Sequence, residues 1–419
     1  MLFTLAISCI TALLAALRLT RRRVYPLPLL PGPRPLPFLS NALQLDTKRP
    51  WLTYTAWGKT YGKIFRSRIL GIDMIIINSE TIAQELLEKR SANYSTRPVL
   101  RTSELAGLAF NSVMLPYGET LRQHRKLYHQ VLSAEVSISY HEIYSRHANE
   151  LVIDLLGATR DSLQQHTEAY SGSLIMAVTY GHLADEGSFL SRAHEILDIG
   201  KQILSPEKAA MFTAFPFLEK LPFWCFGGSF ALMGCCRELC QQLLNEPFNE
   251  VKAQIADGTA SHSSVADFLS QAHDNTDEDM MKSVALTGYM AGMETSDLTL
   301  MSQQTASVLQ AFLLAMMLHP DVQSRARAEI DQAVGHDSMP CLDDRASLPY
   351  LDAILRELCV CMAEALTPCT GIAHATLNDD VYDGYFIPKG AIVMVNQWYV
   401  RLECMQWVEL SIAQGTVSG

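Results

Sequence analysis

The longest helical pattern in the chain covers residues 279–318, and it contains small and acidic residues that an apolar helix does not usually carry. Residues 288–300 read GYMAGMETSDLTL. Ala291 and Thr295 are four positions apart and share one helix face, so their small side chains would leave a flat patch against which a bulky group can lie. Gly292 costs a helix about 1 kcal/mol relative to alanine, which suggests that a neighbouring group approaches it closely.

The polar residues of this stretch permit two interpretations. The Thr295 hydroxyl can donate to the carbonyl of Ala291, which would open the helix locally and present an O–H group to the flat patch. The neighbouring Glu294 could then relay protons. Alternatively, the small residues mark a crossing of two helices, and Glu294 lies in solvent.

Composition limits the classes of protein that the chain can belong to. With 419 residues, of which 48% are hydrophobic and 18% charged, the chain can bury a large core and is expected to be globular. The formal net charge of -11 argues against nucleic acid as a partner, because phosphate contacts require a basic surface.

The ten cysteines occur without CxxC pairs, which indicates reduced thiols rather than a disulfide framework. Cys235, Cys236 and Cys240 lack the histidine or second cysteine pair that would complete a metal site. We interpret them as thiols of a helix core and predict no metal ligand among them.

The N-terminus has the pattern of a membrane anchor. Residues 2–17 are apolar and are followed by Arg18 and by arginines at 21–23, whereas a cleaved signal peptide carries its positive charge first. Residues 1–20 are therefore expected to cross the membrane once and to leave the rest of the chain in the cytosol. Residues 21–40, which are basic and then proline-rich, are expected to form a stiff hinge.

The rest of the sequence predicts a mainly α fold with a small β portion. A helix is expected over 51–61, and two strands joined at Gly71-Ile72-Asp73 are expected within 63–79. From there to about residue 334 the apolar spacing is helical. After Thr370 the sequence turns extended, with turn signals at Asp383-Gly384 and at Pro388-Lys389-Gly390.

Several of these stretches together resemble a microsomal cytochrome P450, most closely the fungal members of that family. The resemblance covers residue 1 to about Trp398, so that 41–398 form the P450-like domain and 399–419 a divergent tail. It rests on PLPLLPGPRPLP, AGMETS, LHPDVQSRARAEID, SLPYLDAILRE and GYFIPKG.

The resemblance carries expectations about function. It implies a haem b cofactor and a monooxygenase that oxidises a lipophilic small molecule, plausibly in fungal secondary metabolism. It also implies electrons from an NADPH–cytochrome P450 reductase and a location in the endoplasmic reticulum membrane with the catalytic part in the cytosol.

The resemblance also assigns roles to residues of the long helix. Ala291 and Gly292 would leave room for dioxygen next to the haem. Thr295, together with Glu294, would organise proton delivery as a general acid.

A second cofactor contact is implied for YGETLRQHRKLYHQ, which resembles the family helix whose tryptophan and arginine hold a haem propionate. Arg125 fits the arginine, and His124 lies next to it. Leu121 stands where the tryptophan is expected, and the loss of an indole donor would weaken the site without abolishing it.

The chain departs from the family pattern at the Glu-x-x-Arg pair. Glu357 matches the glutamate, but Val360 occupies the arginine position. Arg356 is not a simple substitute, because adjacent helix residues point about 100° apart. A buried, unpaired Glu357 would be driven toward protonation or toward solvent.

The glycine-rich loop that carries the family's axial cysteine has no counterpart after Trp398, so the chain is expected to be truncated before it. Cys404 lacks the surrounding glycines, and Cys225 lies in LPFWCFGGSF, which resembles the family's membrane-dipping loop near the substrate entrance. No metal ligand is therefore predicted. The alternative interpretation is a catalytically inactive, membrane-tethered remnant that binds partners.

Overall fold

The computed structural model describes most of the chain, in two units that each have their own core. Unit 1 combines the described residues up to Pro98 with Ala210–Pro216 and with those from Ile372 onward, and unit 2 contains the residues between. The described residues are 25–36, 39–47, 49–159, 162–204, 206–222, 228–271, 277–292, 305–336, 338–366, 372–397 and 399.

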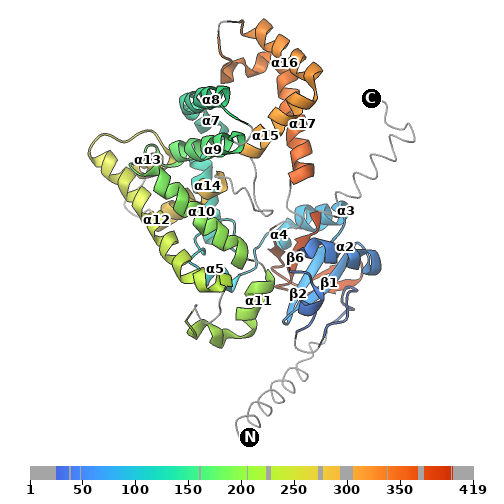
Figure 1. Ribbon diagram of the computed structural model, residues 1–419. Coiled ribbons are helices and arrows are strands. Elements are labelled where there is room, and N and C mark those ends of the chain that lie inside the picture. Colours follow the sequence, from blue (N-terminus) through green and yellow to red (C-terminus); the bar gives the residue numbers. More distant parts are fainter. Residues whose placement is uncertain are drawn as a thin grey trace. The chain divides into compact units, whose positions relative to one another are not determined.

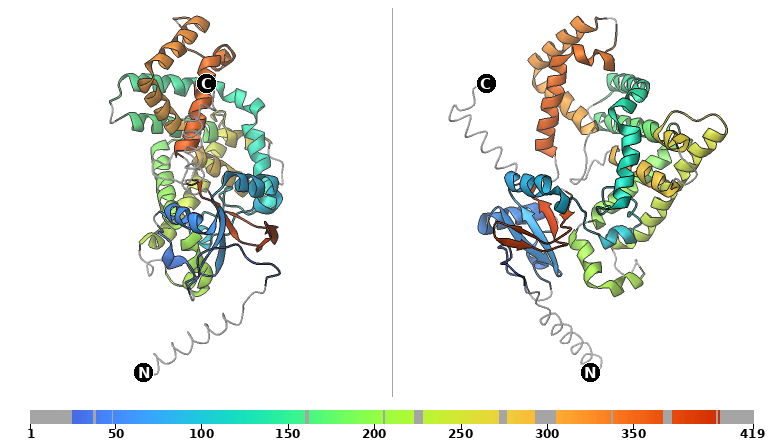
Figure 2. Two further views of the ribbon diagram at one scale, coloured as in Figure 1. Left: turned by 90° about the vertical axis from the view of Figure 1, so that its right-hand side faces the viewer. Right: turned by 180° about the vertical axis from the view of Figure 1, so that it is seen from behind.

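Unit 1 contains a four-stranded sheet built from both ends of the sequence (Figure 1). The strand order is β1 (Ile64–Ile69), β2 (Ile72–Ile77), β6 (Ile392–Val395) and β3 (His374–Ala375). The pair β2 and β6 is parallel, and the other two pairs are antiparallel. Figure 2 shows from two further sides how the N-terminal strands, in blue, and the C-terminal strands, in red, share this sheet. The expected hairpin within 63–79 is confirmed.

Strand β2 explains why the sequence carries a run of isoleucines. Met74 and Ile76 point to one face of the sheet, and Ile75 and Ile77 point to the other, and none of the four is more than 1% exposed. A strand that is covered on both faces requires a continuous apolar run rather than alternation. Tyr54 and Phe65 belong to the core on the first face, and Leu86 and Tyr94 to the core on the second.

A second, two-stranded sheet joins β4 (Asp380–Tyr382) to β5 (Tyr385–Ile387). The two residues of the turn are Asp383, with φ 50°, and Gly384, with φ 78°. Two consecutive residues with positive φ form the turn that matches the twist of a tight hairpin, and aspartate followed by glycine is a preferred pair there. The turn predicted at these residues is confirmed.

Short helices complete unit 1. The helix predicted over 51–61 is confirmed as α2 (Pro50–Tyr61), which has proline in its first turn. The others are η1 (Ala42–Gln44), α3 (Glu80–Ala83), the π-helical η2 (Gln84–Lys89) and α4 (Ser91–Tyr94).

The proline-rich segment packs on the sheet of unit 1. Leu29 forms a parallel bridge with Phe386, and the Arg66 amide donates to the Pro31 carbonyl at 2.8 Å. A Cβ atom at Gly32 would lie 1.8 Å from the Arg66 carbonyl oxygen, so only glycine permits this approach. The predicted hinge of residues 21–40 is thus, from Leu29 to Gly32, part of the folded unit, because its backbone pairs with the sheet.

Unit 2 is helical throughout its described residues. The helix α11 (Pro206–Ala214) runs across the boundary between the two units. The α-helices of unit 2 are α5 (Arg101–Leu105), α6 (Glu119–Leu132), α7 (Ala134–Ser137), α8 (His141–Leu156), α9 (Leu163–Tyr180), α10 (Glu186–Ile203), α12 (Met233–Ala256), α13 (Ser264–Gln271), α14 (Glu278–Gly292), α15 (Thr305–Leu318), α16 (Pro320–Ala333) and α17 (Pro349–Leu366). Short helical turns lie at η3 (Ile138–Tyr140), η4 (Pro216–Lys220), η6 (Gly228–Leu232) and η7 (Leu342–Ser347).

Helix α9 has a central place in unit 2, because it contacts α8, α13, α14 and α15 (Figure 1). Three aromatic rings join α9, α10 and α14: the Phe189 ring lies 5.6 Å from that of Tyr180 and 4.8 Å from that of Tyr289. Of the long helix expected over 279–318, α14 and α15 form the two described parts. Residues 293–304 lie outside the described residues. The predicted end before His319-Pro320 is confirmed.

No helix in the described ranges is long and apolar enough to cross a membrane. The anchor expected within residues 1–20 lies outside those ranges.

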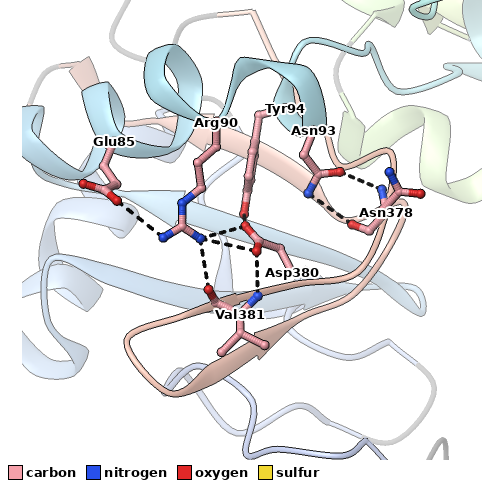
Figure 3. Close-up of polar contacts among 7 residues, drawn as sticks. All are labelled: Glu85, Arg90, Asn93, Tyr94, Asn378, Asp380 and Val381. Atoms are coloured by element: carbon pink, nitrogen blue, oxygen red, sulfur yellow. Dashed lines mark hydrogen bonds and ion pairs between the residues drawn. The ribbon is translucent and has the colours of Figure 1, made fainter.

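A partly buried carboxylate fastens the β4–β5 hairpin to the helical segment that follows β2 (Figure 3). The Asp380 carboxylate accepts hydrogen bonds from the Tyr94 hydroxyl at 2.8 Å, from Arg90 at 3.1 Å and from the Val381 amide at 2.8 Å. The Arg90 guanidinium also donates to the Val381 carbonyl at 3.0 Å and to Glu85 at 3.4 Å. Every polar group in this cluster therefore has a partner, which is what a partly buried charge requires.

We expect Asp380→Asn to lower the free energy of unfolding by about 1–2 kcal/mol, because an amide has a single acceptor oxygen and cannot accept from Tyr94 and Arg90 on one side and from the Val381 amide on the other. Urea-induced unfolding of the full chain in detergent measures the change. The control is Asp383→Asn, which removes the same charge at an exposed turn position. Equal unfolding midpoints for the two variants would contradict the role given to Asp380.

Candidate functional site

Two helices of unit 2, α6 and α14, carry the residues predicted to bind the cofactor. The two helices pack against each other where Tyr128 lies over Gly288, at a distance that a Cβ atom would meet as an ordinary contact of 3.6 Å with the ring. The Tyr128 hydroxyl donates to the Val284 carbonyl of α14 at 3.1 Å. The contact therefore fixes the two helices against each other through both apolar packing and a hydrogen bond.

His124 faces the interior of unit 2. It is 3% exposed, and its Nδ1 atom lies 2.8 Å from the Ser112 Oγ atom. Burial lowers the pKa of His124, while Asp277 opposes that change. The imidazole is therefore a neutral, hydrogen-bonded part of the core at neutral pH.

Arg125 points the other way, because adjacent residues on a helix are about 100° apart. Its side chain is exposed and forms no hydrogen bond or ion pair with the described residues. Leu121, one turn earlier, is 7% exposed and packs into the core. Arg125 is thus available to a ligand, and no described side chain competes for its guanidinium.

At the end of α14, as in α6, one residue faces the interior and its neighbour is exposed. Ala291 is exposed, whereas Gly292 faces α9. A Cβ at Gly292 would lie 2.6 Å from the Ile175 Cγ1 atom, and the Gly292 carbonyl accepts a hydrogen bond from Ser171 at 3.1 Å. Helix α9 is therefore one group that makes the close approach expected at Gly292.

Glu294 and Thr295 lie outside the described residues, as do Cys225 and Cys404. The proton-delivery role of Glu294 and Thr295 therefore stays a prediction.

Glu357 is exposed on α17, so of the two outcomes expected for an unpaired glutamate here, protonation or exposure to solvent, the structure shows exposure. Arg356 does not turn toward it: the guanidinium donates to Asp352 at 2.7 Å, and Arg345 binds the same carboxylate at 2.7 Å. Solvent stabilises the Glu357 charge where no arginine is present at position 360.

The start of α17 is fixed by a carboxylate from α16. The Glu329 oxygens accept from the amides of Tyr350 and Leu351 at 2.8 and 2.9 Å. Free amides at a helix start favour such an anion. This contact positions the helix that carries Glu357.

Sequence reasoning missed a pair of basic side chains in unit 1. The Arg97 guanidinium donates to the carbonyls of Ile372 and Ala373 at 3.1 and 3.0 Å, and His374 Nδ1 lies 2.9 Å from the Tyr94 carbonyl. Burial lowers the pKa of His374, and the Arg97 charge adds to this effect. The two side chains could bind a carboxylate together, but their residues are far apart in the sequence, and the bridge of Ala375 to Thr96 and the neighbouring hydrogen bonds of Asn93 and Tyr94 bring them close.

A cleft of about 520 Å³ opens elsewhere in unit 2. It lies between α8, the end of α9 and the residues before α13, and it contains none of the predicted site residues. Two of its histidines pair with acids of the same wall: His147 with Glu150 at 3.2 Å and His182 with Glu186 at 3.0 Å. Each of these histidines is thus paired with its own acid, and we do not include the cleft in the candidate site.

Comparison with known proteins gives the family. Residues 30–409 match the family model described as Cytochrome P450. The monooxygenase COX1 of Coprinopsis cinerea is 34% identical over 94% of this chain and 76% of its own length. The monooxygenase claR of Ampulloclitocybe clavipes is 32% identical over 94% of this chain and 71% of its own length.

Solved structures share the fold. A zebrafish cytochrome P450 with progesterone has a TM-score of 0.64 at 23% identity and covers 85% of this chain and 81% of its own. The cyanobacterial CYP120A1 with bound retinoic acid has a TM-score of 0.64 at 20% identity, over 88% and 77% of the two chains. Since the family model and the fungal monooxygenases both match most of the sequence, the chain belongs to the cytochrome P450 family.

Proposed function

We propose that this protein is a haem monooxygenase that inserts one oxygen atom into a lipophilic small molecule of fungal secondary metabolism. The observation that supports this most directly is the end of α14, where Ala291 is exposed while Gly292 is held on α9. A small, exposed residue on a firmly packed helix is what a flat cofactor needs for close approach to the backbone. The fungal monooxygenases that match most of the chain agree with this proposal.

The residues of unit 2 fit a haem with carboxylate side groups. Haem b, when bound, supplies the chemistry that activates dioxygen. Arg125 is proposed to bind a haem carboxylate, because its guanidinium is exposed and a guanidinium–carboxylate pair is strong and directional. Ala291 and Gly292 are proposed to border the cofactor, and His124 to support Arg125 from the core side of α6.

Proton delivery is proposed for the residues that follow Ala291 and Gly292. Thr295 and Glu294 would organise proton delivery: the Thr295 hydroxyl would donate its own proton as a general acid while it receives one from the Glu294 carboxyl group. This proposal rests on the AGMETS motif.

Partners and location are proposed from the family as well. An NADPH–cytochrome P450 reductase would supply the electrons, and a single span within residues 1–20 would hold the protein in the endoplasmic reticulum membrane with its catalytic part in the cytosol. The apolar run at 2–17 and the arginines that follow it support this orientation.

A second candidate is a catalytically inactive, membrane-tethered member of the family that acts through protein contacts. It is favoured by the two departures from the family pattern, Leu121 at the tryptophan position and Val360 at the arginine position.

The proposed function is tested by spectroscopy on the full chain expressed with a haem precursor. If the protein is a monooxygenase, the reduced, CO-treated sample shows the red-shifted band of a thiolate-bound haem. An unshifted band would mean haem bound without a thiolate, which would contradict monooxygenase activity. No bound haem would favour the inactive candidate.

We expect Arg125→Ala to weaken haem affinity by roughly tenfold, the effect of losing about 1.4 kcal/mol of binding free energy. Titration of the haem-free full chain with haem, followed by absorbance, measures the change. Arg122→Ala is the matched control, because Arg122 is also exposed on α6 but pairs with Glu119 at 2.8 Å. Equal affinities for the two variants would rule out Arg125 as the carboxylate ligand.

We expect the full chain to stay in the membrane during carbonate extraction and the chain without residues 1–20 to be released. The reason is that no helix among the described residues is able to span a bilayer. Fractionation of cells that produce the full chain and the shortened chain gives the answer. A shortened chain that still resists extraction would contradict the single-span proposal.

A further inference from the structure

A buried polar network joins α6, α14 and the loop before α6. Its centre is the Ser112 hydroxyl, which lies 2.8 Å from His124 Nδ1 and 3.0 Å from the Tyr128 hydroxyl. The Ser112 amide donates to the Thr287 hydroxyl of α14 at 3.2 Å. Ser112, His124 and Thr287 are each no more than 8% exposed.

The geometry fixes the direction of these hydrogen bonds. Tyr128 donates its only proton to the Val284 carbonyl, so its oxygen must accept from Ser112. The Ser112 hydroxyl then has no proton left for His124, and its oxygen must accept from His124 Nδ1. His124 is therefore protonated on Nδ1, and the chain runs in one direction from His124 through Ser112 and Tyr128 to α14.

This network controls the rotation of α6 about its own axis. His124 and Tyr128 are four residues apart and share the face that α6 turns toward α14. Arg125 lies about 100° away on the exposed side, so any rotation that broke the network would carry the guanidinium with it.

We propose that Ser112 and Tyr128 are positioning residues, which hold α6 in one register on α14 through His124 and so fix where Arg125 stands relative to Ala291. This inference rests on the proposed role of Arg125 in haem binding. It adds that His124 donates inward to Ser112 and does not itself donate to a haem carboxylate from Nδ1.

The test is a double-mutant cycle on haem affinity in the full chain. Tyr128→Phe removes one oxygen atom and keeps the ring on Gly288. It should weaken haem binding at least threefold, and Ser112→Ala should do the same. If both act through Arg125, neither should weaken binding further in an Arg125→Ala background, because coupled residues are not additive.

Tyr170→Phe is the matched control, since the Tyr170 hydroxyl is partly buried and forms no hydrogen bond with described residues. It should leave haem affinity unchanged. Hydrogen exchange gives a readout that needs no haem. The amides of α6 and those of α14 at 284–292 should exchange faster in Tyr128→Phe and Ser112→Ala but not in Tyr170→Phe.

Four outcomes would overturn the proposal. Unchanged haem affinity in both variants would remove the positioning role alone, as would an equal loss with and without Arg125, which indicates a general structural effect. Unchanged exchange in α6 and α14 would show that the network does not hold them. A wild-type chain that binds no haem would overturn the proposed function, and the positioning role with it.

Discussion

The contact between Gly292 and the Ile175 side chain fixes where α14 lies on α9, and the candidate site depends on that placement. Because Gly292 has no Cβ, the two helices approach until the Ile175 side chain fills the space a larger residue would need. The next residue around the helix, Ala291, then necessarily faces away from α9. The Ser171 hydroxyl bond to the Gly292 carbonyl holds the same register.

Helix α6 is also held by a contact on one face while the adjacent residue is exposed, but the contact is of a different chemical kind. At Gly292 the anchoring contact is apolar, whereas at His124 it is a chain of buried hydrogen bonds that leaves few choices of rotation. In both helices one residue secures the packing and its neighbour is presented outward. A ligand site built in this way is held by contacts made on the side of each helix away from the ligand.

How much of the fold and of the candidate site the sequence could predict depends on how far apart the interacting residues lie along the chain. The β4–β5 turn and the start of α2 follow from local chemistry, so Asp383-Gly384 and the first-turn proline sufficed to predict them. The parallel pairing of β2 with β6 has no local signal, and neither does the approach of Arg97 to His374. The motif around Arg125 could suggest a function, but it could not tell which of His124 and Arg125 faces the core, because both are basic and adjacent. For Glu357 the motif left two outcomes open, protonation or exposure to solvent, since a motif carries no measure of exposure.

Unit 1 also has a consequence for the order in which the protein is assembled. Its sheet takes two strands from near the start of the chain and two from beyond Ile372, and Leu29 bridges to Phe386. On the ribosome, the N-terminal strands must therefore wait while the helices of unit 2, whose contacts are more local, are synthesised and can already form. During that interval the isoleucines of β2 lack β6, the strand that will lie beside them, so the apolar surface of this hairpin is most exposed before β6 has been synthesised.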